Sequence, residues 1–370
     1  MKKIINLSIV MPLLAVSLFV VHCTGNEQNV FDKKYIKSTM EAAVNWQFAN
    51  PKHDPRDWTN GAFYAGVYAA WETTGSQSIY DAMMNTFTSV GWTPYRRWYH
   101  ADDIAICQTY VDLYRMEKRP EMIQAFVDTL NKLIENPYPV RGIEVIKWWW
   151  CDALFMGPPA MVKAGLTTGN MEYLVKSDEY FMECYDLLYD REECLFARDL
   201  VFVIKDDESD RYEANGKKIF WSRGNGWVMG GLVRILQELP LDYPKRPFYE
   251  QLFQEMAAKV QSLQQEDGLW RASLLDPDSY PGGEASGSGF YCYALAYGVN
   301  SGLLDQSFLP AVEKAWAGLN RCLQPDGKVG WVQPIGLDPR KNFSEESWEV
   351  YGTGAFLLAG SEVIKLKRKR

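Results

Sequence analysis

The feature that most constrains this chain is a set of six segments that read as helices with apolar residues on most of their surface. The first runs from Gly61 to Trp71. The others begin near Asp103, Asp152, Asn225, Gly289 and Gly354. Several are rich in glycine and alanine, which allows helices to approach closely around a common axis. A helix without a polar face needs neighbours on every side, so the six segments predict an inner ring.

Helices of a second kind alternate with these, and successive inner segments lie roughly forty to seventy residues apart. Apolar residues recur on one side of these helices at helical spacing, while polar residues fill the other sides. Three such stripes are Met122, Phe126, Leu130 and Leu133, just after Pro120; Phe248, Leu252, Met256, Val260 and Leu263; and Val312, Trp316, Leu319 and Leu323. One-sided helices belong on an outside surface, and six outer–inner pairs predict an (α/α)6 barrel.

The last two pairs repeat in residues as well as in pattern. The two repeats are Leu263-Gln264 with Asp267-Gly268, which recurs as Leu323-Gln324 with Asp326-Gly327, and Glu284 with Gly287-Ser288-Gly289, which recurs as Glu349 with Gly352-Thr353-Gly354. An open array would need capping repeats, and none is evident in the sequence. We therefore expect an all-α fold in which residues 23–370 form one closed barrel.

The first residues read as an export signal. Lys2 and Lys3 precede an apolar run, which predicts a signal segment over residues 1–22 that takes no part in the fold. Val20-Val21-His22-Cys23 resembles the lipobox of bacterial lipoproteins, in which the cysteine is lipidated, although His22 departs from the small residue that this pattern prefers. We expect an exported protein, in the periplasm or anchored to a membrane through Cys23. An uncleaved anchor and a simple cleaved signal are the alternatives.

Charge and residue usage exclude several kinds of partner. Without Lys2 and Lys3 the chain has 37 basic and 47 acidic side chains, whereas nucleic-acid binding needs a basic face. After the signal segment, His53 and His100 are the remaining histidines and the cysteines form no C-x-x-C pair, so no metal or other cofactor is expected. The 14 tryptophans and 21 tyrosines are typical of proteins that stack aromatic rings on sugars.

In a closed barrel of hairpins all inner helices start at the same end, so the residues at their starts converge. These residues lie in the ranges 58–60, 100–103, 147–152, 221–227, 284–289 and 348–354, and they include carboxylates, cations and many aromatic rings. Helix N-termini add partial positive charge that is aimed at the same place. This end of the barrel is predicted to bind an anionic ring.

Asp152 opens one inner segment, directly after the run Trp148-Trp149-Trp150-Cys151. One interpretation is a helix N-cap, whose side chain accepts hydrogen bonds from free backbone N–H groups. The other is a general acid that keeps its proton because indole rings exclude water around it. This stretch alone does not separate the two interpretations.

A second stretch, Trp221-Ser222-Arg223-Gly224-Asn225-Gly226-Trp227, brings two indoles, a guanidinium and an amide together. The planar fork of Arg223 matches a carboxylate through two hydrogen bonds, and Trp221 and Trp227 suit the floor and wall of a sugar site. The alternative is a glycine-rich helix entry with packed tryptophans and a structural arginine.

The two stretches together resemble the unsaturated rhamnogalacturonyl hydrolases of glycoside hydrolase family 105 and, more distantly, the unsaturated glucuronyl hydrolases of family 88. The resemblance covers essentially the whole chain after the signal segment, and it implies an (α/α)6 barrel. Enzymes of this kind hydrate the C4–C5 double bond of the uronic acid that polysaccharide lyases leave at a non-reducing end. An aspartate protonates C4, water adds at C5, and the resulting hemiketal opens and expels the neighbouring sugar.

By motif match, the resemblance implies that Asp152 is this acid and base, and that Arg223 holds the uronate together with Trp221 and Trp227. It also implies a second aspartate on the preceding inner helix, where the candidates are Asp102, slightly favoured, and Asp103; the other of the two would then cap the helix. The remaining candidate substrate-binding residues at this end are Asn225, Lys147, His100 and Trp150.

Two other functions remain open at this point. An ordinary glycosidase would place two carboxylates around the anomeric bond, and Asp152 with Asp102 or Asp103 could supply them. A sugar-binding lipoprotein without activity would need the aromatic rings but no acid. The expected partner is in each case an oligosaccharide, and the sugar joined to the uronate is left open between rhamnose, galactose and a sulfated rhamnose.

Overall fold

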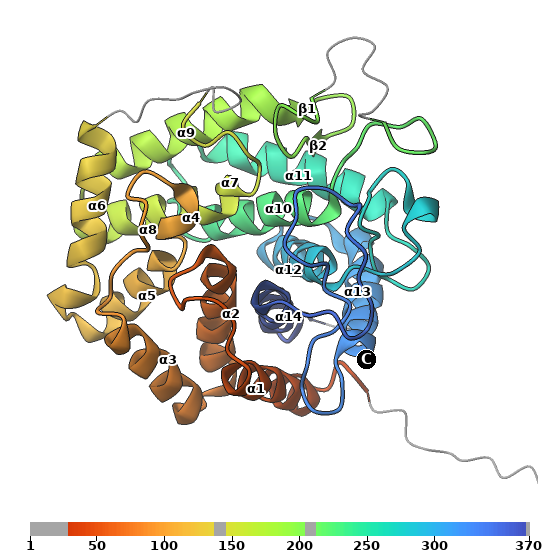
Figure 1. Ribbon diagram of the computed structural model, residues 1–370, viewed down its shortest axis with the longest axis horizontal. Helices are drawn as coiled ribbons and strands as arrows, with labels where there is room; N and C mark the ends of the chain where they lie inside the picture. Colours follow the sequence, from red (N-terminus) through yellow and green to blue (C-terminus); the bar gives the residue numbers. More distant parts are fainter. Residues whose placement is uncertain (1–28, 137–145, 204–211, 368–370) are drawn as a thin grey trace, which may run out of the picture.

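The computed structural model describes residues 29–136, 146–203 and 212–367. Within them, two concentric rings of helices form an (α/α)6 barrel, as the alternating pattern predicts (Figure 1). The outer ring consists of α1 (Lys33–Ala49), α3 (Gln77–Ser89), α6 (Gln124–Glu135), α9 (Glu172–Leu188), α11 (Arg246–Ser262) and α13 (Leu309–Cys322). The inner ring consists of α2 (Trp58–Thr74), α4 (Ala101–Ile104) with α5 (Cys107–Glu117), α7 (Ala153–Met156) with α8 (Pro158–Thr168), α10 (Ser222–Leu236), α12 (Ala285–Ser301) and α14 (Val350–Val363).

Short elements join the helices. β1 (Tyr189–Asp190) and β2 (Leu195–Phe196) form an antiparallel pair, in which Tyr189 lies opposite Phe196. Single 3-10 turns occupy Pro120–Met122, Pro277–Ser279 and Gln306–Phe308. This small pair of strands is the one sheet within the described residues.

The inner helices are buried on all sides, which explains why their sequences lack a polar face. Every residue of α14 is buried. The first and last inner helices close the ring: a methyl group on Gly66 of α2 would lie 2.6 Å from the carbonyl oxygen of Gly354, and one on Gly354 would lie 2.4 Å from that of Ala62. These two backbones can approach so closely because neither position carries a side chain.

Two inner helices begin earlier than the sequence pattern indicates. α12 starts at Ala285 and α14 at Val350, one helical turn before Gly289 and Gly354. Gly289 and Gly354 are not helix entries: both lie inside a helix, where a neighbouring helix leaves no room for a side chain. Close packing and helix entry both select glycine, so the sequence does not distinguish them.

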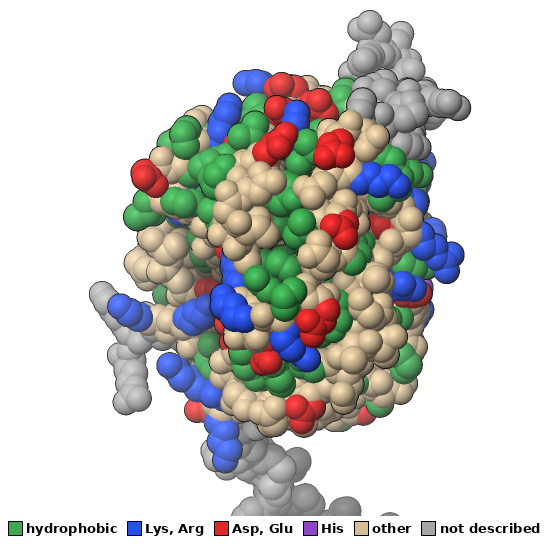
Figure 2. All heavy atoms as spheres, turned by 90° about the vertical axis from the view of Figure 1, so that its left-hand side faces the viewer, with side chains coloured by type: hydrophobic (Ala, Val, Ile, Leu, Met, Phe, Trp, Pro, Cys, Tyr) green, Lys and Arg blue, Asp and Glu red, His purple; other side chains and the backbone are tan. Residues whose placement is uncertain are grey.

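The one-sided helices form the outer ring. Phe126, Leu130 and Leu133 of α6 are at most 1% exposed, and the predicted stripes of α11 and α13 are largely buried too. On the face of the molecule that carries α3 and α6, acidic and basic side chains are interspersed (Figure 2). The polar sides of these helices therefore meet solvent, as their patterns predict.

The candidate signal segment, residues 1–22, and Cys23 lie outside the described residues. Among the helices that the structure does describe, none is both long enough and apolar enough to cross a bilayer. The first of them, α1, is capped by Asp32, whose carboxylate accepts hydrogen bonds from the backbone N–H groups of Lys34 and Tyr35.

The inner helix that follows Asp152 is broken at Gly157. Its first piece, α7, ends just before Pro158 and Pro159. Neither proline has a backbone N–H, so the helical hydrogen bonds that would reach back to the carbonyl oxygens of Leu154 and Phe155 cannot form. The break separates α7, the short helix that follows Asp152, from α8.

Candidate active site

The starts of three inner units come together at one end of the barrel. α4 packs against α7, and α7 packs against α10 (Figure 1). Asp102 lies in α4 and Asp152 directly precedes α7, and the charge of Asp152 is felt at Asp102. The hairpin pattern thus correctly predicts that these two carboxyl groups, fifty residues apart in the chain, are neighbours.

Asp152 is not a helix cap. It is 7% exposed, and its side chain makes no capping hydrogen bond to the start of α7. The Cys151 thiol donates to Oδ1 across 3.2 Å. Burial raises the pKa of Asp152, while the nearby charges of Arg198 and Arg223 oppose this effect. A buried carboxyl group that caps nothing is suited to hold a proton and to release it.

The aspartates at 102 and 103 have different surroundings. Asp103 is 1% exposed and is bound by Arg97, which donates from its backbone N–H at 2.6 Å and from Nε at 3.0 Å. The Oδ2 atom of Asp102 lies farther from its neighbours, 3.8 Å from Arg97 Nη2 and 3.5 Å from His100 Nδ1. Burial raises the pKa of Asp102 to about 8, and the charge of Asp152 adds to the rise. Asp103 holds Arg97 and the loop before α4 in place. Asp102 is therefore the better candidate to act with Asp152.

His100 caps α4, which neither aspartate does. Its Nδ1 accepts a hydrogen bond from the backbone N–H of Asp102 at 3.3 Å, so the expectation that an aspartate is the cap is wrong. Burial lowers the pKa of His100 to about 3, with a further contribution from the charge of Arg97, and the ring is therefore neutral. The rings of His100 and Trp150 lie 4.5 Å apart and place an aromatic surface beside Asp102.

Arg198 is a cation of this site that the sequence does not reveal. Its Nη1 pairs with Asp199 at 2.5 Å, its guanidinium lies 5.6 Å from the centre of the Trp149 ring, and its carbonyl oxygen accepts from the backbone N–H of Cys151 at 2.9 Å. Its charge lowers the pKa of Asp152 more than any other neighbouring group does. The buried Nε has no hydrogen-bond partner within the described residues. Arg198 follows a strand and starts no inner helix, so no motif marks it.

The guanidinium of Arg223 is not an open fork. Its Nη1 donates to the carbonyl oxygen of Gln333 at 2.6 Å and its Nη2 to that of Pro334 at 2.9 Å, and the side chain is fully buried. Trp221 lies against it, with the indole N–H donating to Gln333 Oε1 at 2.7 Å. In this structure a distant loop occupies the planar fork that the sequence suggests for a carboxylate. A role for Arg223 and Trp221 in substrate binding stays a prediction.

Trp227 and Asn225 are packing residues in this structure. Trp227 is 0% exposed, with its ring centroid 4.9 Å from that of Phe155 and 4.5 Å from that of Phe290. The Asn225 side chain accepts from the backbone N–H of Phe196 at 2.8 Å and donates to its carbonyl oxygen at 3.0 Å, which ties β2 to α10. The alternative of a glycine-rich helix entry therefore accounts for these two residues better than direct sugar contact.

Lys147 points toward the outer helices. Its Nζ donates to the Tyr180 hydroxyl at 3.0 Å and to the carbonyl oxygen of Leu133 at 3.3 Å. Nothing in the structure brings it to Asp152, so its placement in the site is not supported. Within residues 29–136, 146–203 and 212–367, no cluster of three or more His, Cys, Asp or Glu side chains is placed to hold a metal ion.

Comparison with known proteins adds to this geometry. Residues 25–367 match the family described as Glycosyl Hydrolase Family 88. An unsaturated 3S-rhamnoglycuronyl hydrolase from Formosa agariphila is 48% identical, over 90% of this chain and 91% of that protein. A solved glycosyl hydrolase family 88 structure from Bacteroides vulgatus has a TM-score of 0.82 at 30% identity, covering 90% of this chain and 99% of its own. A structure named as a polysaccharide lyase has the same TM-score at 32% identity, covering 90% and 97%.

Proposed function

Because this chain belongs to glycosyl hydrolase family 88, we propose that it removes a 4,5-unsaturated uronic acid from the non-reducing end of oligosaccharides that a polysaccharide lyase has released. The observation that carries the proposal is Asp152, a buried carboxyl group that caps no helix and whose pKa is raised by burial. A protein that merely bound sugars would need no such group.

The chemistry needs one proton donor next to the double bond. Protonated Asp152 transfers its proton to C4, and the positive charge that develops at C5 is shared with the ring oxygen. Water adds at C5 and loses a proton to Asp152, which acts first as acid and then as base. The hemiketal at C5 then opens, and the bond to the neighbouring sugar is broken without attack at the anomeric carbon.

Asp102 helps to keep a proton available for this step. Two interacting carboxyl groups titrate as a pair, and burial raises the pKa of Asp102 to about 8. The pair therefore retains a proton at neutral pH, and Asp152 delivers it. Neutral His100 and the ring of Trp150 exclude water from this side of the pair.

The carboxylate of the substrate is assigned to Arg198. This guanidinium lies close enough to Asp152 to lower its pKa, and its Nε is unpartnered within the described residues. A carboxylate fixed there would orient the ring and hold C4 toward Asp152. The terminal nitrogens of Arg223 are already bound to the carbonyl oxygens of Gln333 and Pro334, so its part is to hold that loop in place.

The leaving sugar is assigned from the relative that shares 48% of its residues, which is named for a 3S-rhamnoglycuronyl substrate. We expect the same linkage to be the best substrate here. Turnover of a panel of lyase-generated disaccharides would test this, with sulfated rhamnose, unsulfated rhamnose or galactose next to the unsaturated uronate. Equal rates on all three would remove this assignment and leave the reaction itself unaffected.

The reaction is tested in heavy water. Hydration places one deuterium at C4 of the released uronate and abolishes the absorbance of the conjugated double bond. A two-carboxylate glycosidase would leave C4 unlabelled and would also cleave a saturated uronoside. A lyase, the activity that one similar structure is named for, would instead increase the absorbance when given an intact polysaccharide. Either of the last two outcomes would overturn the proposed function.

We further propose that the enzyme lies outside the cytoplasm, as a lipoprotein anchored to a membrane through Cys23. Two acyl chains are needed for stable anchoring, so the wild-type protein should sediment with membranes and the Cys23→Ala variant should be released. Recovery of wild-type protein in the soluble fraction with an unmodified N-terminus would contradict the anchor.

A further inference from the structure

The break after α7 leaves a buried carbonyl oxygen that the helix itself cannot satisfy. In an unbroken helix the oxygen of Phe155 would accept a hydrogen bond from the backbone N–H of residue 159, but Pro159 has none. Phe155 is 0% exposed, so water does not replace the missing donor. Leaving such a buried group unpaired is costly, and it would loosen the short helix that follows Asp152.

Gln108 of the neighbouring helix α5 supplies the missing hydrogen bond. Its side chain is fully buried, and Nε2 lies 2.8 Å from the carbonyl oxygen of Phe155 and 3.4 Å from that of Met156. The amide oxygen of Gln108 accepts a hydrogen bond from Nε of Arg234, which comes from the far half of α10. An amide can donate to a carbonyl and accept from a guanidinium at once, so both ends of Gln108 are used.

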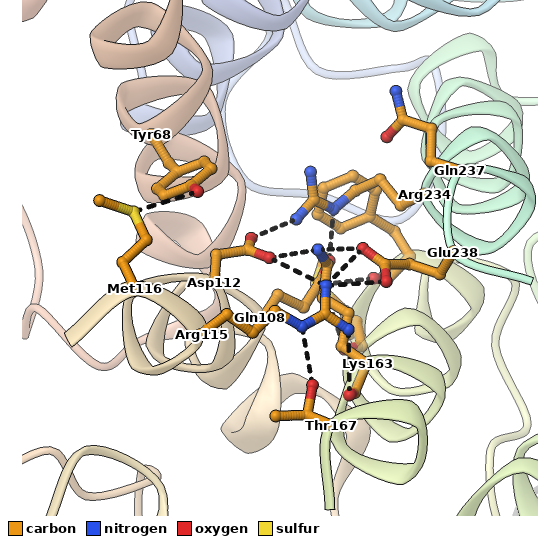
Figure 3. Close-up of polar contacts among 12 residues, drawn as sticks. Tyr68, Gln108, Asp112, Arg115, Met116, Lys163, Thr167, Arg234, Gln237 and Glu238 are labelled. Atoms are coloured by element: carbon orange, nitrogen blue, oxygen red, sulfur yellow. Dashed lines mark hydrogen bonds and ion pairs between the residues drawn. The ribbon is translucent and has the colours of Figure 1, made fainter. Parts of the chain in front are cut away.

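Arg234 belongs to an ion-pair network at the opposite end of the barrel from Asp152 (Figure 3). Its Nη2 lies 3.8 Å from Asp112, and Lys163 bridges Asp112 at 2.5 Å and Glu238 at 2.7 Å. Arg115 completes the network, 2.9 Å from Glu238. These five side chains line a cavity of about 670 Å³ formed by the last turns of the inner helices.

We propose that Gln108, held by Arg234, is a positioning residue that fixes α7 and thereby the carboxyl group of Asp152. The chain of contacts runs from Arg234 through Gln108 to the carbonyl oxygens of Phe155 and Met156, one turn after Asp152. Asp152 is part of the same turn, since its own carbonyl oxygen accepts from the backbone N–H of Phe155 at 3.1 Å.

The consequence for catalysis follows from distance alone. Proton transfer to carbon needs the carboxyl group within about 3–3.5 Å of C4, and a displacement of about 1 Å lowers the rate roughly 10²-fold. Substrate binding through Arg198 depends on the stretch after β2, which is tied to Cys151 before α7 and not to α7 itself. Loss of the Gln108 hydrogen bonds should therefore lower kcat much more than it raises KM.

The experiment replaces Gln108 with methionine, which keeps the volume and removes all three hydrogen bonds, to Phe155, to Met156 and from Arg234. Gln108→Met should lower kcat by about 10- to 100-fold with KM within about threefold of wild type. The matched control is Gln237→Met: Gln237 lines the same cavity but makes no bond to α7, so its kcat should stay unchanged. A second control, Leu130→Ala in the outer helix α6, supplies a comparable loss of stability far from α7.

A readout without substrate separates this inference from the proposed function, on which the kinetic part rests. Hydrogen–deuterium exchange of peptides covering residues 150–157 should speed up in Gln108→Met and stay unchanged in both controls. Wild-type kcat together with wild-type exchange in folded Gln108→Met would overturn the inference. If Gln108→Met does not fold, Gln108→Glu takes its place: its carboxylate still accepts from Arg234 but cannot donate to Phe155, and the same two outcomes decide. An inactive wild-type enzyme would overturn the function, and the exchange result would still decide the positioning role.

Discussion

Two pairs of buried carboxyl groups, Asp102 with Asp152 at one end of this barrel and Asp112 with Glu238 at the other, have opposite surroundings. Where the inner helices start, Asp152 is in none of the ion pairs that the structure describes, and Asp102 has one long contact to a cation, 3.8 Å to Arg97, besides its contact to neutral His100. Where the inner helices end, Lys163 alone lies within 2.7 Å of both Asp112 and Glu238. The two pairs are similarly buried, but among the described residues a cation lies within 2.7 Å only at Asp112 and Glu238.

The carboxyl groups at the two ends also differ in their pKa. Burial raises the pKa of Asp152 and brings that of Asp102 to about 8. Burial acts in the same direction on Glu238, yet the charges of Lys163 and Arg115 outweigh it and hold the pKa of Glu238 below its ordinary value. Burial alone therefore does not make a carboxyl group a proton donor; burial without a close cation does.

The strongest test of this comparison removes the proton donor at the site end. Asp152→Asn keeps the shape of the side chain but cannot transfer a proton to carbon, so kcat should fall by at least about 100-fold without loss of folding or substrate binding. Steady-state kinetics and thermal unfolding measure both effects. Asp178→Asn is the matched control, a buried aspartate bound by the hydroxyls of Tyr243 and Tyr249, and it should keep full activity. Near wild-type kcat in Asp152→Asn would make the assignment wrong.

The next test removes the cation at the opposite end. Lys163→Met leaves Asp112 and Glu238 buried without their shared partner, and should lower the free energy of unfolding at pH 7 by about 3–5 kcal/mol. Urea denaturation measures the loss. Adding Glu238→Gln to this variant should restore part of it, since one uncompensated charge is then gone. Unchanged stability in Lys163→Met would show that the far end is no more dependent on ion pairing than the site end.

A smaller effect is expected when Asp102 is made neutral. Its folded-state pKa is raised, so the stability it contributes is full below the unfolded pKa near 3.8 and is lost as pH rises through about 8. Asp102→Asn has no such proton to lose, so its stability relative to wild type should increase as the pH rises from about 5 towards 8 and change little above that. Melting temperatures across this range measure the difference. Parallel curves would mean that Asp102 titrates normally.

The smallest expected effect distinguishes the role of Arg198 from that of Arg223, the two arginines whose charges act on Asp152. Arg198→Lys keeps the charge but loses the planar fork, and should raise KM by roughly tenfold for the unsaturated uronate and little for its methyl ester. Arg223→Lys should instead lower the melting temperature by a few degrees with a smaller change in KM, because Arg223 binds the loop at Gln333 and Pro334. The reverse result would return the uronate to Arg223.

The barrel could be predicted because its signals are local. Each inner or outer helix carries its own pattern of apolar residues, and alternation of the two kinds leaves few arrangements. The closeness of Asp152 to Asp102 could also be predicted, because helix starts in successive hairpins must meet; that the two act together is implied by the resemblance alone and stays a prediction. The resemblance to the unsaturated uronyl hydrolases, carried by residues 148–159 and 221–227, is confirmed by the family match.

The roles of individual side chains could not be predicted because they depend on distant segments. Arg223 and Trp221 are engaged by a loop more than a hundred residues away, and Asn225 is engaged by β2. Arg198 stands in an irregular stretch that no motif marks. Gln108 looks like an ordinary polar residue of a helix until the carbonyl opposite it is known to lack a donor.

The contact between α2 and α14 sets a condition on how the molecule folds. Gly66 and Gly354 meet at van der Waals distance although almost the entire described chain lies between them. Contacts of such long sequence separation form late and slow the search for the native state. Until the last inner helix is available, α2 and α12 each lack a neighbour and expose apolar surface. A chain synthesised from its N-terminus is therefore prone to aggregation until α14 has been made. Truncation before residue 350 should prevent folding altogether.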